Sequence, residues 1–245
     1  MENMRNSDME LIKTELTRFL MSYKFALDEM NTKIDILKQE FQYIHEYNPI
    51  EHVKSRLKTP QNILKKAYRK GYELSLKSIR ENIRDIAGIR ITCSFISDIY
   101  KLINMIRERK DITVIECKDY IKNPKPNGYK SLHLIIQIPI FMSDRVEDVF
   151  VEIQIRTIAM DFWASLEHKI YYKYNKEVPA DLLKELKEAA DTVSQLDMKM
   201  ERLNREVSKY KENDDSNITL PEILIDDVKL SISHEFFTQF LRLNE

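Results

Sequence analysis

Glycine is scarce in this chain, which has only 3 among its 245 residues. Barrels and β-sandwiches use glycine in many of their turns, so this scarcity argues against both architectures. It also excludes two nucleotide-binding motifs, because neither a P-loop nor a GxGxxG sequence occurs.

Cysteine and long apolar runs are also lacking. Cys93 and Cys117, the 2 cysteines, lie in apolar, strand-like runs, and we interpret them as buried free thiols of a reducing compartment. The sequence holds no apolar run of about 18 residues and no signal peptide. We therefore expect a cytoplasmic protein that does not contact a membrane.

The overall charge is small, and its distribution is uneven. A net charge of −1 argues against a general polyanion binder, so any phosphate site must be local. Residues 54–70, KSRLKTPQNILKKAYRK, contain seven lysines or arginines and no acid. Lys58, Asn62, Lys66 and Arg69 share one face if the segment is helical. This segment is either a solvated basic face or a phosphate site, and its contrast with the neutral chain favours a phosphate site.

Hydrophobic periodicity predicts helices in the first part of the chain. Residues 9–47 form one long predicted helix, which Asn48-Pro49 ends. Residues 50–58 are expected to continue as helix or turn. A further helix follows to Lys70, with Thr59 as its N-cap and Gly71 as its stop.

The middle of the chain predicts a sheet. Four segments have the composition of strands: 88–95, 112–118, 131–140 and 149–156. A helix at 97–109 joins the first two, and a short polar turn makes the last two an antiparallel hairpin. The expected fold is α/β (α+β), with a mixed β-sheet and helices packed on one face.

The C-terminal part is again helical. Residues 157–174 predict an aromatic-rich helix, residues 211–219 a flexible polar link, and residues 234–243 a short amphipathic helix. A heptad pattern begins at residue 182. It consists of Leu182, Leu186, Ala189, Val193, Leu196, Met200, Leu203, Val207 and Tyr210. This stripe could pack on the 9–47 helix, but both helices are longer than one small sheet can cover, so we expect a homo-oligomer.

The heptapeptide VEIQIRT, residues 151–157, carries an unusual polar strand face. Its apolar residues alternate with Glu152, Gln154 and Arg156. Asp85 precedes the 88–95 strand, and Gly88 permits close approach of a ligand. Two carboxylates that face one way on neighbouring strands predict a Mg²⁺ site.

The segment KPNGYKSLH, residues 125–133, is a polar loop that leads into a strand. Tyr129 is either an ordinary loop residue or an exposed ring that stacks on a base. His133 is more often a hydrogen-bonding group than a catalyst, and no histidine or cysteine spacing indicates zinc. Basic groups, two carboxylates and an aromatic loop together predict phosphoryl-type transfer between nucleotides.

Several ordered motifs in this sequence resemble the synthetase domain of the RelA/SpoT superfamily. They are DIAGIRI, DYI…KPNGYKSLH, VEIQIRT and FWASLEHKIYYK. The resemblance covers roughly residues 20–210, and the short length is similar to that of small alarmone synthetases, with more similarity to the RelP branch than to the RelQ branch. It implies a nucleotidyltransferase-like synthetase core with long flanking N- and C-terminal helices, and a homotetramer.

The resemblance implies a GTP pyrophosphokinase of the stringent response. Such enzymes transfer the β,γ-pyrophosphate of ATP to the ribose 3′-OH of GDP or GTP, which gives AMP and ppGpp or pppGpp. Asp85 and Glu152 would bind Mg²⁺, and Glu152 would also activate the 3′-OH. The implied ATP-binding residues are Arg56, Lys58, Lys66, Arg69 and Arg90. The implied residues on the GDP or GTP side are Lys118, Lys125, Tyr129, His133, Gln154, Arg156 and Asp161. Lys130 stands where relatives often have arginine.

Asp161 offers a hypothesis for base selection. Its carboxylate could accept hydrogen bonds from N1–H and the 2-amino group of guanine, which adenine does not offer. The alternative is an acid that the N-terminal dipole of a helix favours.

We expect four regions in the chain. They are residues 1–48, an N-terminal helical region; 49–175, the catalytic core; 176–212, an oligomerisation helix; and 213–245, a tail without assigned role. Two other functions stay open. One is a transferase for another acceptor, an adenine nucleotide or a tRNA end, and the other is an RNA-binding regulator that uses residues 54–70. A purely structural oligomer would leave the polar strand face unexplained.

Overall fold

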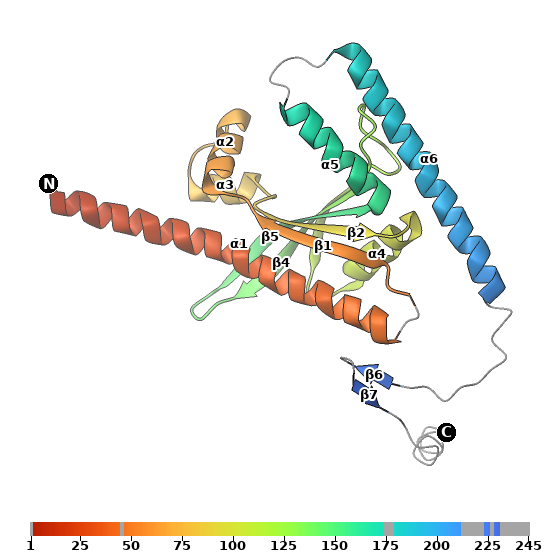
Figure 1. Ribbon diagram of the computed structural model, residues 1–245. Helices are drawn as coiled ribbons and strands as arrows, with labels where there is room; N and C mark the ends of the chain where they lie inside the picture. Colours follow the sequence, from red (N-terminus) through yellow and green to blue (C-terminus); the bar gives the residue numbers. More distant parts are fainter. Residues whose placement is uncertain (1, 45–46, 174–178, 212–222, 226–227, 231–245) are drawn as a thin grey trace.

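A five-stranded mixed sheet forms the centre of the molecule (Figure 1). The computed structural model describes residues 2–44, 47–173, 179–211, 223–225 and 228–230. The strand order is β1-β2-β5-β4-β3. The strands are β1 (Ile50–Leu57), β2 (Ala87–Cys93), β3 (Thr113–Asp119), β4 (Leu132–Phe141) and β5 (Val146–Thr157). The pair β2–β5 is parallel and the other pairs are antiparallel, so the predicted mixed sheet and the hairpin of its last two strands are confirmed.

One face of the sheet is covered by helices and forms the core. Alternate residues of the central strands, such as Ile89, Leu134 and Ile153, are buried on this face. They pack in one cluster with side chains of α1 (Glu2–Ile44), α3 (Leu76–Asn82) and α4 (Ile96–Glu108). Tyr23 and Met30 of α1 are both 1% exposed. The β-branched, period-two pattern thus buries one face of each strand, as expected.

The opposite face carries polar side chains and is bordered by other helices. Helix α2 (Pro60–Lys70) lies at one end of the sheet, and α5 (Ile158–Lys173) lies near the other end, with α6 (Ala180–Lys211) packed along it (Figure 1). The predicted boundaries of α2 are confirmed, because Thr59 caps its N-terminus and Gly71 ends it in the left-handed conformation with φ 69°.

The segment 50–58 was wrongly predicted as helix or turn, since residues 50–57 form strand β1. This strand pairs with β2 at the edge of the sheet, and most of its side chains are polar and exposed. An edge strand needs little apolar surface, so its sequence IEHVKSRL lacks the alternation that reveals a buried strand. Lys58 therefore follows a strand and does not share a helical face with Lys66.

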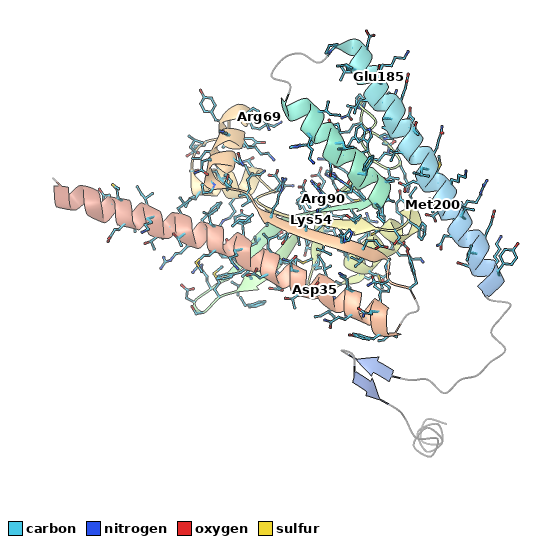
Figure 2. The ribbon with its side chains drawn as sticks, in the orientation of Figure 1. Asp35, Lys54, Arg69, Arg90, Glu185 and Met200 are labelled. Carbon is cyan, nitrogen blue, oxygen red and sulfur yellow. The ribbon has the colours of Figure 1, made fainter. Side chains whose placement is uncertain are left out.

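The heptad helix packs against α5 and α4, and not against α1 as one interpretation had it. Most of its predicted stripe stays exposed, including Leu196 at 53% and Met200 at 47% (Figure 2). Helix α1 also has exposed apolar residues near its N-terminus, such as Leu11 and Ile12, where it extends past the sheet (Figure 1). Both long helices thus present apolar surface that their own chain does not cover in the described residues.

Three other short elements did not stand out in the sequence. They are α3, which Ser75 caps, and a two-stranded pair formed by β6 (Ile223–Ile225) and β7 (Val228–Leu230). The predicted helix at 234–243 and nearly all of the polar link 211–219 lie outside the described residues.

Both cysteines are free thiols, but only one is buried. Cys93 lies in the core, whereas Cys117 is exposed on β3. The prediction of a buried Cys117 was wrong because β3 is an edge strand, whose apolar run does not require burial on both faces. Among the described helices, none combines the length and the apolar character needed to cross a membrane.

Candidate active site

Two neighbouring rows of side chains cross the polar face of the sheet. In the first row, cross-strand pairing places five polar residues side by side, one from each strand: Lys54, Arg90, Gln154, His133 and Lys118. In the second row, Arg56 and Glu152 stand on either side of Gly88, and the row continues through Ile135 to Glu116. The register of five strands therefore assembles residues that are distant in the sequence.

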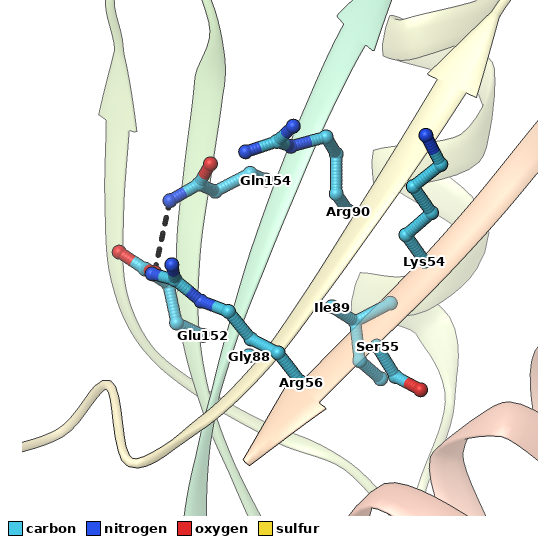
Figure 3. Close-up of a pocket in the computed structure, with 8 residues that line it drawn as sticks. All are labelled: Lys54, Ser55, Arg56, Gly88, Ile89, Arg90, Glu152 and Gln154. Carbon is cyan, nitrogen blue, oxygen red and sulfur yellow. Dashed lines mark hydrogen bonds between the residues drawn. The ribbon is translucent and has the colours of Figure 1, made fainter. Parts of the chain in front are cut away.

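Gly88 forms the floor of a pocket between β1 and β5 (Figure 3). The pocket has a volume of about 270 Å³, and Arg56, Arg90, Glu152 and Gln154 line it. These four side chains extend toward a common space in Figure 3. Two guanidinium groups with a carboxylate beside them suit a planar, electron-rich ligand that also carries negative charge.

Asp85, two residues before the start of β2, is held by two lysines. Its Oδ2 lies 2.5 Å from the Nζ of Lys58, and its Oδ1 lies 2.8 Å from the Nζ of Lys66. Burial raises the pKa of Asp85, but the two lysine ammonium groups beside it outweigh burial and leave the pKa below its ordinary value. The carboxylate is therefore ionised, and two cations of the basic segment meet an acid instead of solvent.

A closed ring of polar contacts joins β4, β5 and the preceding loop. Gln154 donates to Glu152 (2.9 Å) and accepts from Arg156 (2.9 Å). Arg156 donates to the hydroxyl of Tyr129 at 2.6 Å, and that hydroxyl lies 2.7 Å from Nε2 of His133. The ring closes where His133 Nδ1 comes within 3.7 Å of Glu152. Each side chain is thus oriented by two neighbours.

Glu152 is the acid of this ring that also faces the pocket. Burial raises its pKa, but the neighbouring His133 and the amide of Gln154 outweigh burial, so its pKa lies below the ordinary value. The charge of Asp85 opposes this shift, which places the two carboxylates within electrostatic reach of each other. Glu152 is therefore an ionised carboxylate in a largely buried setting.

Arg156 is 4% exposed and is the most buried charge of the site. Asp161, in the first turn of α5, accepts it at 3.2 Å and also forms an ion pair with Arg90 at 3.3 Å. The acid predicted to read a base is thus the counter-ion shared by two arginines. Asp161 therefore links Arg90, which lines the pocket over Gly88, to Arg156, which contacts the hydroxyl of Tyr129. We call this pocket the β1–β2 pocket.

Tyr129 is half-buried, which lies between the two alternatives of an ordinary loop residue and an exposed ring. Arg156 and Lys125 both lie over its ring, 5.1 Å and 4.7 Å from the centroid. Tyr120, which sequence reasoning missed, packs edge-on at 6.1 Å. Tyr120 belongs to the motif DYI, which carries part of the family resemblance. Nothing in the local sequence indicated that its aromatic side chain packs against Tyr129.

Other predicted residues lie further from the ring. Lys118 is on the edge strand β3, next to His133 in register, and pairs with Glu116 at 2.8 Å. Arg69 is exposed on α2 and forms no ion pair within the part of the chain that the structure describes (Figure 2). Lys54 was missed because β1 was not predicted as a strand, and period two from Arg56 would have found it.

The carboxylates of Asp85 and Glu152 fit a hard divalent cation. Oδ1 of Asp85 is a buried oxygen without a hydrogen bond of good geometry, although Lys66 pairs with its charge. Among the described residues, no group of three or more histidines, cysteines or acids is arranged to hold a metal. Mg²⁺ commonly binds through one or two carboxylates and completes its shell with water and substrate phosphates. This donor set therefore suits Mg²⁺ delivered with a nucleotide.

Comparison with known proteins identifies relatives over most of the chain. Residues 55–177 match the family model described as a region found in RelA / SpoT proteins. GTP pyrophosphokinase YwaC of Bacillus subtilis is 54% identical over 200 residues, which covers 82% of this chain and 95% of that protein. GTP pyrophosphokinase YjbM of the same organism is 40% identical over 78% of this chain and 90% of that protein.

Solved structures agree with these sequence matches. The crystal structure of small alarmone synthetase 2 from Bacillus subtilis superposes with a TM-score of 0.72 at 53% identity, over 78% of this chain and 99% of that one. Small alarmone synthetase 1 from Bacillus subtilis bound to its product pppGpp gives 0.73 at 39% identity, over 79% and 98%. The same synthetase bound to AMPCPP gives 0.68 at 37% identity, over 80% and 99%.

The lysine pair predicts how the free protein responds to metal. Lys66→Met keeps most of the side-chain stem but removes one charge from Asp85, so Mn²⁺, used as a spectroscopic substitute for Mg²⁺, should bind the free protein about tenfold more tightly. Electron paramagnetic resonance of free Mn²⁺ measures this affinity. The control is Lys65→Met, an exposed neighbour on α2 that does not contact Asp85. Equal Mn²⁺ affinity in both variants would show that Lys66 does not compete with metal at Asp85.

Proposed function

Because the chain belongs to the RelA/SpoT family, we propose that it is a (p)ppGpp synthetase, a GTP pyrophosphokinase of the small alarmone synthetase type. It transfers the β,γ-pyrophosphate of ATP to the ribose 3′-OH of GDP or GTP and releases AMP. One observation carries the proposal: Glu152 stands between an arginine-lined pocket on one side and an aromatic, cationic loop on the other. Two nucleotides bound in these places would meet at its carboxylate.

ATP binds on the β1–β2 side in this proposal. Arg56 and Arg90 lie on adjacent strands and offer two planar cations to the faces of adenine. Lys58 and Lys66, already placed at Asp85, turn to the triphosphate when it enters. Arg69 on the same helix extends this cationic surface. Most of the basic residues of segment 54–70 thereby bind ATP.

GDP or GTP binds on the β4–β3 side. Tyr129 stacks on the guanine base, with Lys125 and Lys118 near the acceptor's phosphates. The hydroxyl of Tyr129 is held by Arg156 and His133, and Gln154 supports Arg156 in the same set of polar contacts. Asp161 accepts from the guanine edge through the oxygen that its two arginines leave unused.

Glu152 is the general base for the 3′-OH. A ribose hydroxyl is a weak nucleophile, and an adjacent ionised carboxylate can take its proton as the new bond to phosphorus forms. When bound at Asp85 and Glu152, Mg²⁺ would neutralise charge on the transferred phosphates. The protein's own part is to align both nucleotides and to keep Glu152 ionised and oriented by His133 and Gln154.

Assembly and location complete the proposal. Residues 49–175 form the catalytic core, and the α6 region, residues 176–212, joins copies of the chain into a homotetramer through its exposed stripe. The use of ATP and guanine nucleotides places the enzyme in the cytoplasm.

The activity is tested directly by product analysis. Protein, Mg²⁺, ATP and GDP are incubated, and AMP and a guanosine tetraphosphate are resolved by anion-exchange chromatography. ADP replaces GDP in a parallel reaction to test for an adenine acceptor. Formation of AMP together with the guanosine tetraphosphate is the expected result, whereas ATP hydrolysis without a modified guanosine refutes the proposal.

Removal of the Glu152 carboxylate should abolish most of this activity. Glu152→Gln keeps the shape and the contact with Gln154 but cannot accept a proton, so turnover should fall at least about a hundredfold. Steady-state kinetics at saturating Mg²⁺ measure the loss, and Glu81→Gln, an exposed change on α3, is the matched control. Turnover near the unaltered rate in Glu152→Gln contradicts the assignment of the base.

The exposed stripe of α6 predicts self-association. Leu196→Glu places a charge in the stripe and should reduce the mass measured by light scattering. Gln195→Glu adds the same charge at an exposed neighbouring position outside the stripe and should leave the mass unchanged. A monomeric mass for the unaltered protein would refute the oligomer.

A further inference from the structure

The loop that carries Tyr129 packs against α6 as well as against the sheet. Gly128 is buried with φ +87°, a conformation that favours glycine, and a Cβ added there would lie only 2.5 Å from the Cβ of Ala190. The same Cβ would lie 3.8 Å from the backbone of Lys187. The backbone of the loop therefore touches one face of α6 with no room for a side chain between them.

The residues on both sides of Gly128 are also anchored to helices. The amide of Asn127 donates to Glu167 of α5 at 3.2 Å. The ammonium of Lys130 donates to the hydroxyl of Ser194, which lies one helical turn after Ala190 on α6. Lys130, noted as a departure from related sequences, thus contacts α6. Three neighbours of Tyr129 in the chain take their positions from α5 and α6.

The contact between loop and helix is well packed. Trp163 of α5 is 5% exposed and donates its indole N–H to the backbone oxygen of Leu186 at 3.1 Å. Ala164 and Ala190 complete a small cluster, against which Tyr129 packs. The cavity between loop, α5 and α6 measures only about 10 Å³. A larger side chain at position 190 therefore cannot be absorbed by empty space.

Helix α6 is itself fixed to the core further along its length. Thr157, which directly follows Arg156, donates to Asp197 at 2.5 Å, and the backbone N–H of Ser97 donates to Glu201 at 3.2 Å. Both contacts lie on the same side of α6 as Ala190. Because the helix is held there, an enlarged residue 190 would push the loop away and leave the helix in place.

We infer that Ala190 is a positioning residue for the acceptor nucleotide, because its contact with Gly128 sets where Tyr129 stands. Tyr129 links the two parts of this arrangement. Its backbone belongs to the loop that packs on α6, and its hydroxyl contacts Arg156 and His133. A shift of the loop would move the side chain of Tyr129 away from Arg156 and His133. No residue of α6 lines the β1–β2 pocket, so a shift of the loop should affect ATP binding less than GDP binding. This inference rests on the proposed acceptor site.

The test compares binding of GDP with binding of a non-hydrolysable ATP analogue by titration calorimetry. Ala190→Leu should weaken GDP binding about tenfold or more, with the affinity for the ATP analogue kept within about twofold. Trp163 is the single tryptophan of the chain, so its emission spectrum reports the same packing without labels. Its emission should shift in Ala190→Leu.

Three further variants keep the test decisive. Asp191→Leu places the same side chain at an exposed neighbouring position of α6 outside the apolar stripe and should leave GDP binding unchanged, with light scattering used to check the mass of both leucine variants. Ala190→Gly removes bulk and should retain GDP binding, whereas an equal loss in Ala190→Gly would show that the helix is merely disturbed and would overturn the inference. Ala190→Val replaces Ala190→Leu if the latter no longer binds the ATP analogue.

The outcomes separate the inference from the proposed function. Normal GDP affinity in the folded Ala190→Leu or Ala190→Val variant overturns the inference while the unaltered protein still binds GDP. Absence of GDP binding by the unaltered protein refutes the proposed acceptor site, and the inference with it.

Discussion

The parallel pairing of β2 with β5 is the constraint on which the site depends. It aligns Gly88 with Glu152 and Arg90 with Gln154, and the flanking antiparallel strands extend these two pairs into rows across the sheet. Because side chains alternate with period two, a slip of one residue would turn Glu152 into the core and bring isoleucines to the polar face. The buried face, where Ile89 and Ile153 pack against α1 and α4, fixes this register. The same strand register therefore determines both the packing of the core and the arrangement of the polar residues in the site.

The polar face balances its charges internally. Two lysines hold Asp85, and two arginines hold Asp161. Such pairing keeps buried charges from standing alone, which would destabilise the fold. In the proposed ATP site, phosphates would replace Asp85 as the partner of both lysines. Nucleotide binding and the release of Asp85 from its lysines would then occur together.

The sequence was most informative where strands are central and least informative at edges and tertiary contacts. VEIQIRT revealed Glu152, Gln154 and Arg156 because β5 has neighbours on both sides and its alternation is complete. Strand β1 was missed because an edge strand needs few apolar residues, and Lys54 was missed with it. The partial burial of Tyr129 depends on Ala190, far along the chain, and no local pattern reports such a contact. The ion pairs of Asp85 and Asp161 likewise required the folded arrangement.

The central claim is that one face of the sheet holds both nucleotides, with Glu152 between them. A crystal structure of the protein with Mg²⁺, a non-hydrolysable ATP analogue and GDP tests it most directly. The account predicts adenine beside Arg56 and Arg90, guanine on the ring of Tyr129, and the ribose 3′-OH of GDP within hydrogen-bond reach of Glu152. Either nucleotide bound away from this face, or a 3′-OH remote from Glu152, would contradict the account.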